Sequence, residues 1–146
     1  MSEKDKMMDS IACVNLQMLR ASHSVLKSYD DAYRPFGVKA TQLPVLNLLS
    51  QIGTATTKEI ALQTMTERSV LSRKLQVMHK NEWIIPQYIR NTREKAYTLT
   101  EKGQELVNET MPIRLDVQQK IMSKLSEEER NLLINLCDKL QESLPA

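Results

Sequence analysis

Residues 56–80 of the chain read TTKEIALQTMTERSVLSRKLQVMHK, a run that contains two helical patterns and one turn. Thr56 and Glu59 have the S/T-x-x-E spacing of a capping box, which predicts a short helix over residues 58–63. A second helix is predicted over residues 67–80. Two helices joined by a turn of about three or four residues have the helix-turn-helix geometry.

The second of these helices is amphipathic, and Thr66 can cap its first turn. Its inner face is predicted to consist of Val70, Leu71, Leu75 and Met78. Its other face is polar and basic, with Arg68, Ser69, Ser72, Arg73, Gln76 and Lys80. A basic helix face is typical of a solvated surface as well as of a nucleic-acid contact, so this pattern alone leaves both interpretations open.

The periodicity changes after this helix. Residues 83–90 (WIIPQYIR) read as a first short strand with a period of two, whose two sides are Trp83, Ile85, Gln87 and Ile89, and Ile84, Pro86, Tyr88 and Arg90. Residues 91–94 (NTRE) form a polar turn, and residues 95–99 (KAYTL) read as a second short strand. This is the pattern of a β-hairpin. Pro86 places the first strand at an edge, because proline has no N–H to donate. A helix-turn-helix followed directly by a hairpin predicts a winged helix.

Long helices are predicted on both sides of this region. The first, over residues 8–33, ends at Arg34-Pro35-Phe36-Gly37, and the next begins near residue 40 and ends at Gly53. After the hairpin, Thr100 caps a helix from residue 101, in which Pro112 is expected to cause a kink. Ser126 and Glu129 form the capping box of the last helix.

The outer helices carry more apolar residues than one core needs. In the first helix these are Ile11, Val14, Leu16, Met18, Leu19, Val25, Leu26, Tyr29 and Tyr33, and in the last they are Leu132, Leu133, Leu136, Leu140 and Leu144. Two apolar faces on one helix favour a dimer contact. We therefore predict a helical dimerisation region over residues 8–36 and 101–144 around a winged helix-turn-helix region over residues 40–100, all within the single chain 1–146.

Composition agrees with one mainly helical domain that also has a small β-hairpin, an α+β arrangement. The 146 residues are 41% hydrophobic and 26% charged and include three glycines, which is unlike disordered chains or turn-rich β-sandwiches. No apolar run approaches the ~18 residues of a membrane span, and the charged start lacks an apolar signal core. These features predict a cytoplasmic protein. Cys13 and Cys137 are far apart and His23 and His79 are isolated, so no metal site or cofactor is predicted.

Charge is unevenly distributed along the chain. Residues 54–103 carry nine Lys or Arg against five Asp or Glu, whereas residues 104–146 carry five against eight. A basic middle region suits a polyanion such as DNA. A chance fluctuation of a few charges is the alternative.

Several motifs in this order resemble the multiple-antibiotic-resistance regulator (MarR) family. They are Phe36-Gly37-Val38 before a helix with Gln42, Val45 and Leu46; Thr57-Lys58-Glu59-Ile60-Ala61; Ser72-Arg73; and Leu99-Thr100-Glu101-Lys102-Gly103. The resemblance spans nearly the whole chain. It implies a homodimeric transcription regulator, a repressor of pseudo-palindromic operators in double-stranded DNA that a small aromatic or carboxylate effector releases.

The chain departs from the family pattern in three places. Glu82 stands where the family usually has glycine, and Asn81 is expected to take the left-handed conformation instead. The wing reads Asn91-Thr92-Arg93 where the family has Asp-x-Arg. Lys39 occupies the usual threonine cap before the second helix.

The candidate DNA contacts come from both halves of the winged helix. Recognition-helix arginines can bind guanine through two hydrogen bonds, and an arginine at a hairpin tip can enter the minor groove. The candidates are Thr57, Arg68, Ser69, Ser72, Arg73, Lys74, Arg90, Arg93 and Lys95. For Thr57 the alternative is helix capping, and for Lys74 it is exposure to solvent.

An effector pocket is implied by the resemblance, between the dimerisation helices and the winged domain. Arg20, His23, Tyr33 and Met65 are its candidate residues. Cys13 is a redox candidate, although we expect it to pack as a small buried side chain, as we also expect for Cys137.

Two other classes of function are alternatives to DNA binding. A dimeric protein–protein interaction module could keep the winged fold and lose DNA binding. The arginines at positions 68, 73 and 93 argue against this alternative. An enzyme is excluded because the sequence has no nucleophile–base set, glycine-rich phosphate loop or metal-ligand spacing.

Overall fold

A computed structural model describes the backbone of residues 1–142, and their side chains except those of residues 10–12. Ile11 and Leu144, which the sequence places on apolar helix faces, lie outside these described parts. The helices are α1 (Glu3–Tyr33), the short 3-10 helix η1 (Arg34–Phe36), α2 (Leu43–Ile52), α3 (Thr57–Thr64), α4 (Arg68–Lys80), α5 (Glu101–Met122) and α6 (Glu127–Glu142). The strands are β1 (Thr54–Thr56), β2 (Ile84–Gln87) and β3 (Ala96–Leu99).

The winged helix contains a three-stranded antiparallel sheet in the order β1-β3-β2. The sequence does not predict strand β1, because its three residues are too few to show a period and they pair only with β3, 40 to 44 positions later. Pro86 lies in the edge strand β2, as predicted. The hairpin strands are shorter than expected, so the wing loop covers residues 88–95 rather than a four-residue turn.

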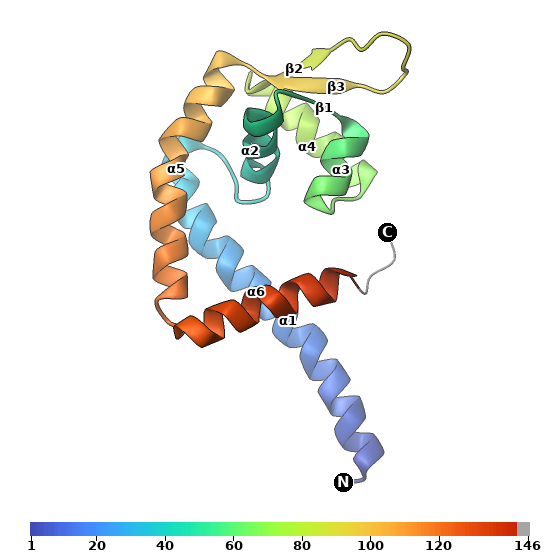
Figure 1. The fold of residues 1–146 in the computed structure, drawn as a ribbon, viewed down its shortest axis with the longest axis vertical. Helices are drawn as coiled ribbons and strands as arrows, with labels where there is room; N and C mark the ends of the chain where they lie inside the picture. The colour runs from blue at the N-terminus through green and yellow to red at the C-terminus, as the bar shows by residue number, and fades with distance from the viewer. Residues whose placement is uncertain (143–146) are drawn as a thin grey trace.

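The core of the winged domain lies among α2, α3, α4 and the sheet (Figure 1). Its fully buried side chains include Val45, Leu46, Ile60, Leu71, Met78 and Ile84. In α4 the prediction of Leu71, Leu75 and Met78 as inner residues is confirmed. The placement of Val70 on the same face is wrong, because Val70 is 50% exposed.

Three helix starts differ from the prediction. Helix α1 begins at Glu3, because Ser2 and Asp5 form a capping box. Helix α2 begins at Leu43, after a turn over residues 40–42. Thr66 does not cap α4: its hydroxyl donates to the carbonyl of Thr64 at 3.1 Å, and the cap position belongs to the next residue along the chain.

Glu82, rather than Asn81, takes the left-handed conformation after α4. The φ angle is −78° at Asn81 and +64° at Glu82. The Glu82 N–H donates to the His79 carbonyl at 2.9 Å, and its own carbonyl accepts from the Thr100 hydroxyl at 2.5 Å. The surrounding bonds therefore fix this conformation at a residue with a Cβ, where the family pattern has glycine.

The start of α5 is joined closely to the sheet. The Thr100 hydroxyl accepts from the Gly103 N–H at 3.0 Å, while the Thr100 N–H donates to the Trp83 carbonyl at 3.0 Å. Gly103 lies directly against that carbonyl, and a Cβ there would overlap it. This explains the Thr-x-x-Gly spacing in the motif that follows the wing.

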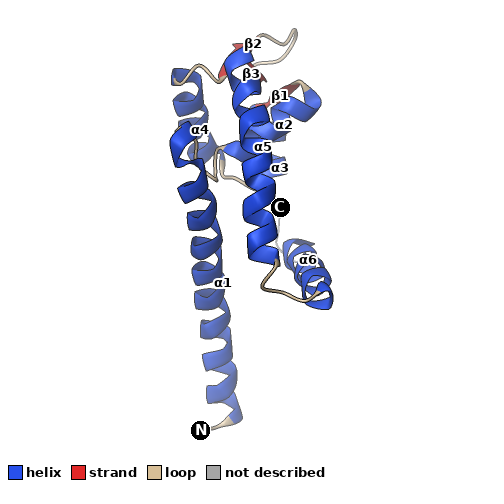
Figure 2. Cartoon of the chain, turned by 90° about the vertical axis from the view of Figure 1, so that its left-hand side faces the viewer, coloured by secondary structure: helices blue, strands red, loops and turns tan. Residues whose placement is uncertain are grey.

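The outer helices project from the winged domain (Figures 1 and 2). Helix α1 packs against α5, and its N-terminal half extends away from the rest of the chain. Helix α5 continues through Pro112, and α6 turns across α1 in the view of Figure 1. None of the described residues of α6 is buried, and most of α1 before Leu26 is exposed.

We predict that Glu82→Gly stabilises the fold by about 0.5–1 kcal/mol. Glycine adopts a positive φ without steric cost, and this gain exceeds the loss of the exposed 3.6 Å ion pair between Glu82 and Lys102. The measurement is urea unfolding. Glu82→Ala is the control, since it loses the ion pair but keeps the Cβ, and it should give no stabilisation.

Candidate nucleic-acid interface

The predicted contact residues of α4 form an exposed surface at the start of the helix. Arg68, Ser69, Ser72 and Arg73 are all exposed. Ser69, Ser72 and Arg73 lie outside the face of α4 that carries Leu71 and Leu75, and Arg68 is exposed because it is in the first turn. These side chains are therefore free to contact a groove of DNA. The N-terminal half of a recognition helix is the part that contacts base edges in helix-turn-helix proteins.

Lys74 does not belong to this exposed surface. It is half-buried and lines a cleft on the other side of α4, where burial lowers the pKa of its ammonium group. Val70 and Val77 are exposed on the flank of α4 next to Lys74. The position of Lys74 thus differs from the sequence-based assignment, which placed it among the DNA contacts.

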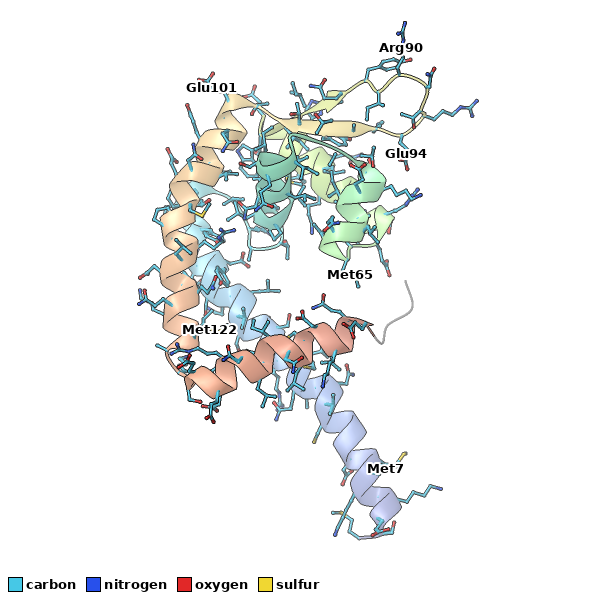
Figure 3. All side chains as sticks on the ribbon, viewed as in Figure 1. Met7, Met65, Arg90, Glu94, Glu101 and Met122 are labelled. Carbon is cyan, nitrogen blue, oxygen red and sulfur yellow. The ribbon has the colours of Figure 1, made fainter. Side chains whose placement is uncertain are left out.

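The wing carries three exposed cations, Arg90, Arg93 and Lys95. Figure 3 shows Arg90 at the outer end of the wing loop, pointing away from the helices. Asn91 adopts a left-handed conformation with φ of +69°, which asparagine tolerates better than most residues. The turn that presents Arg93 is therefore shaped by the residue that replaces the aspartate of the family pattern.

Thr57, the first residue of α3, connects this helix to the wing by hydrogen bonds. Its N–H and its hydroxyl both donate to the Lys95 carbonyl, at 2.9 and 3.1 Å. The helix cap is Thr56, which forms the predicted capping box with Glu59. Because both donors of Thr57 are used by Lys95, its main contribution is to hold the base of the wing against α3.

Glu94 is not among the residues that the sequence predicts to contact DNA, yet it connects the wing to α4. Its Oε1 lies 3.7 Å from Nη2 of Arg68. The Glu94 N–H donates to the Thr92 hydroxyl at 3.1 Å. No local pattern marks this pair, because Arg68 and Glu94 are far apart in the chain and meet only when the wing folds beside α4.

A cleft of about 1040 Å³ lies between the outer helices and the winged domain. Tyr33 and Met65 line it, as predicted, whereas Arg20 and His23 are not among its described lining residues. Figure 3 shows Met65 on the side of the winged domain away from the wing. The charged side chains that do line the cleft are Lys74 and Arg114.

The tyrosines of the cleft are packed together. The ring centroids of Tyr29 and Tyr33 are 5.8 Å apart. Burial, with a smaller contribution from Tyr29, raises the pKa of Tyr33 to about 12, while Arg114 acts in the opposite direction. Tyr33 therefore presents a neutral phenol to the cleft over the physiological range of pH.

Comparison with known proteins gives the same architecture. No protein-family model matches the chain. Its sequence is 23% identical over 120 residues to YwoH of Bacillus subtilis, an uncharacterised HTH-type transcriptional regulator, covering 82% of this chain and 88% of that protein.

Among solved structures, a mutant of MarR from E. coli complexed with operator DNA has a TM-score of 0.84 at 19% identity, covering 94% of this chain and 97% of that one. The regulator MOSR of M. tuberculosis in complex with DNA has a TM-score of 0.77 at 26% identity, covering 89% and 97%. The chain has the winged-helix fold of the MarR family. The resemblance and the fold class predicted from the sequence are confirmed.

The proteins to which this chain is similar include transcription regulators, the class predicted from the sequence. In the described part of the chain, no cluster of side chains could hold a metal ion. No described helix is long and apolar enough to cross a membrane.

The positions of the two cysteines differ from expectation. Cys13, expected to be buried, is exposed on α1, and Cys137 on α6 is half-buried. The prediction of a packed Cys13 is wrong for the single chain, because this stretch of α1 has no neighbouring element to cover it.

Proposed function

We propose that this chain is a DNA-binding transcription regulator that acts in the cytoplasm as a homodimer, represses from pseudo-palindromic operators and releases DNA when a small aromatic or carboxylate effector binds. The observation that carries the proposal is the exposed basic start of α4 beside a wing with three exposed cations. The fold supports it, since similar chains with this fold have been solved in complex with DNA.

The DNA-binding part of the proposal assigns different grooves to the two elements. Arg68, Ser69, Ser72 and Arg73 of α4 face the major groove, where arginine binds guanine O6 and N7. Arg93 and Arg90 of the wing face the phosphates and the minor groove. Lys95 lies at the base of the wing, next to the sugar–phosphate backbone.

The homodimer is supported by apolar surface on the outer helices. Exposed side chains include Val14, Leu16, Met18 and Leu19 of α1 and Leu132, Leu133, Ile134 and Leu136 of α6. A large contiguous apolar surface is uncommon on a monomer. A second copy, packed through α1, α5 and α6, covers this surface and places two recognition helices in successive major grooves.

The effector part of the proposal rests on the cleft. Its walls carry two cations, Lys74 and Arg114, beside the aromatic rings of Tyr29 and Tyr33. A flat aromatic acid matches this combination, because its ring packs on the tyrosines and its carboxylate pairs with the partly desolvated Lys74. Since Lys74 belongs to α4, such binding acts directly on the recognition helix.

We predict that the preferred site, selected from a random DNA library, is a pseudo-palindrome whose half-sites are about 10 base pairs apart. Arg68→Ala should cost about 1–3 kcal/mol and relax the preference at one base pair of each half-site. Arg93→Ala should weaken binding in a way that depends on minor-groove width. The measurement is binding affinity against salt concentration.

The matched control for these variants is Lys124→Ala, which removes an exposed cation in the turn after α5. It should leave affinity and salt slope unchanged. If Arg68→Ala and Arg93→Ala also leave both unchanged, the DNA-contact proposal fails and the protein–protein interaction module takes its place.

We predict that the protein is a dimer at micromolar concentration and that Leu136→Glu disrupts it, because a charge then replaces an apolar side chain of the proposed contact. Light scattering measures the mass. Asn135→Glu adds the same charge at the neighbouring position of α6 without removing an apolar side chain and should remain dimeric. A stable wild-type monomer contradicts the proposal.

We predict that Lys74→Met weakens the binding of aromatic carboxylates such as benzoate or 2-naphthoate about tenfold, since a hydrogen bond to a charged group is lost. Calorimetry of the protein without DNA measures this binding. Lys80→Met, on the exposed face of the same helix, is the control and should bind the acids as the wild type does. Equal binding to both variants contradicts an effector contact at Lys74.

A further inference from the structure

Glu94 is the one carboxylate of the wing loop and lies at a fixed point of it. On one side its N–H is bonded to the Thr92 hydroxyl. On the other side, the carbonyl of the next residue, Lys95, accepts both donors of Thr57. Glu94 is half-buried, unlike the exposed wing cations, and Figure 3 places it where the loop returns toward β3, on the side that faces α3.

This anchored carboxylate reaches the first residue of the recognition helix. The Oε1 of Glu94 is 3.7 Å from Nη2 of Arg68. A guanidinium has five N–H donors in a rigid plane, so one edge can face a carboxylate while the other edge stays available. The Arg68 side chain remains 68% exposed, which leaves that second edge accessible to a ligand.

We propose that Glu94 is a positioning residue for base recognition: it orients the Arg68 guanidinium toward guanine and, by its charge, weakens binding to DNA of unrelated sequence. This assignment rests on the proposed function. The orientation matters because free arginine has many rotamers, and fixing them before binding lowers the entropy cost of the two-hydrogen-bond contact with guanine. The charge matters because a carboxylate near phosphates repels every DNA sequence equally.

These two effects of Glu94 act in opposite directions on specific and non-specific binding. Removing the charge should strengthen binding to any sequence, whereas releasing Arg68 should weaken the preference for guanine. A residue with only an electrostatic role changes both affinities together. The ratio of the two affinities therefore separates positioning from simple repulsion.

The test measures the DNA affinity of four proteins: the wild type, Glu94→Gln, Arg68→Ala and the double variant. Each protein is measured with three DNAs, which are the selected operator, the same operator with the Arg68-dependent guanine replaced, and random-sequence DNA. Glu94→Gln should reduce the preference for guanine about threefold, the scale of an exposed ion pair. It should raise the affinity for random DNA about twofold at low salt, and this gain should disappear at high salt. In the Arg68→Ala background, Glu94→Gln should have no effect on base preference.

Glu67→Gln is the matched control. Glu67 is an exposed carboxylate at the cap position of α4, adjacent in sequence to Arg68. The Glu67→Gln variant should have a higher affinity for all DNA than the wild type and the same preference for guanine. Thermal unfolding of each variant should match the wild type, because these side chains are at the surface.

Two results overturn the assignment while leaving the proposed function intact. In the first, Glu94→Gln behaves as Glu67→Gln does, with unchanged guanine preference. In the second, its effect on preference persists without Arg68. A wild type that selects no DNA sequence at all overturns the proposed function and this assignment with it.

Discussion

The junction around Thr100 is the constraint on which the rest of the structure depends. The hydroxyl of Thr100 accepts from the Gly103 N–H and donates to the Glu82 carbonyl, and its N–H donates to the Trp83 carbonyl. These bonds join the end of α4, the sheet and the start of α5 within a few residues. The close approach of Gly103 to Trp83 permits no side chain between them.

This junction determines how the outer helices are positioned relative to the winged domain. Helix α5 starts at this junction and packs against α1. The direction of α5 therefore determines where the outer helices lie relative to the winged domain. The cleft lies between these parts, and Lys74 lines it from α4, the helix that also carries the exposed Arg73 about 100° further around its axis. A group bound in the cleft therefore contacts the same helix that carries part of the proposed DNA surface.

The wing depends on contacts of a different kind. It extends beyond the sheet. Its loop is held at the base by the two hydrogen bonds from Thr57 to the Lys95 carbonyl, and near the turn by the hydrogen bond from the Glu94 N–H to the Thr92 hydroxyl. Side chain-to-backbone bonds of this kind do not need a hydrophobic core, so the loop can stay exposed and still present its cations in one arrangement. The pair of Arg68 and Glu94 then connects this loop to α4.

The sequence by itself determined the order of the elements, the capping boxes at Thr56 and Ser126, the stop at Gly37 and the edge position of Pro86. Each is encoded by residues a few positions apart, whose bonds form within one turn or strand. The wing and the basic start of α4 were predictable for the same reason.

Only the tertiary structure decided the third strand, the conformation of Glu82, the exposure of Val70 and the direction of Lys74. One residue is about 100° around a helix, so Val70 and Lys74 lie at the boundary of the inner face of α4, and their surroundings depend on which elements pack there. Strand β1 forms because β3 offers it a free edge, and Glu94 meets Arg68 because the wing folds beside α4. Contacts between residues this far apart in the chain leave no local pattern in the sequence.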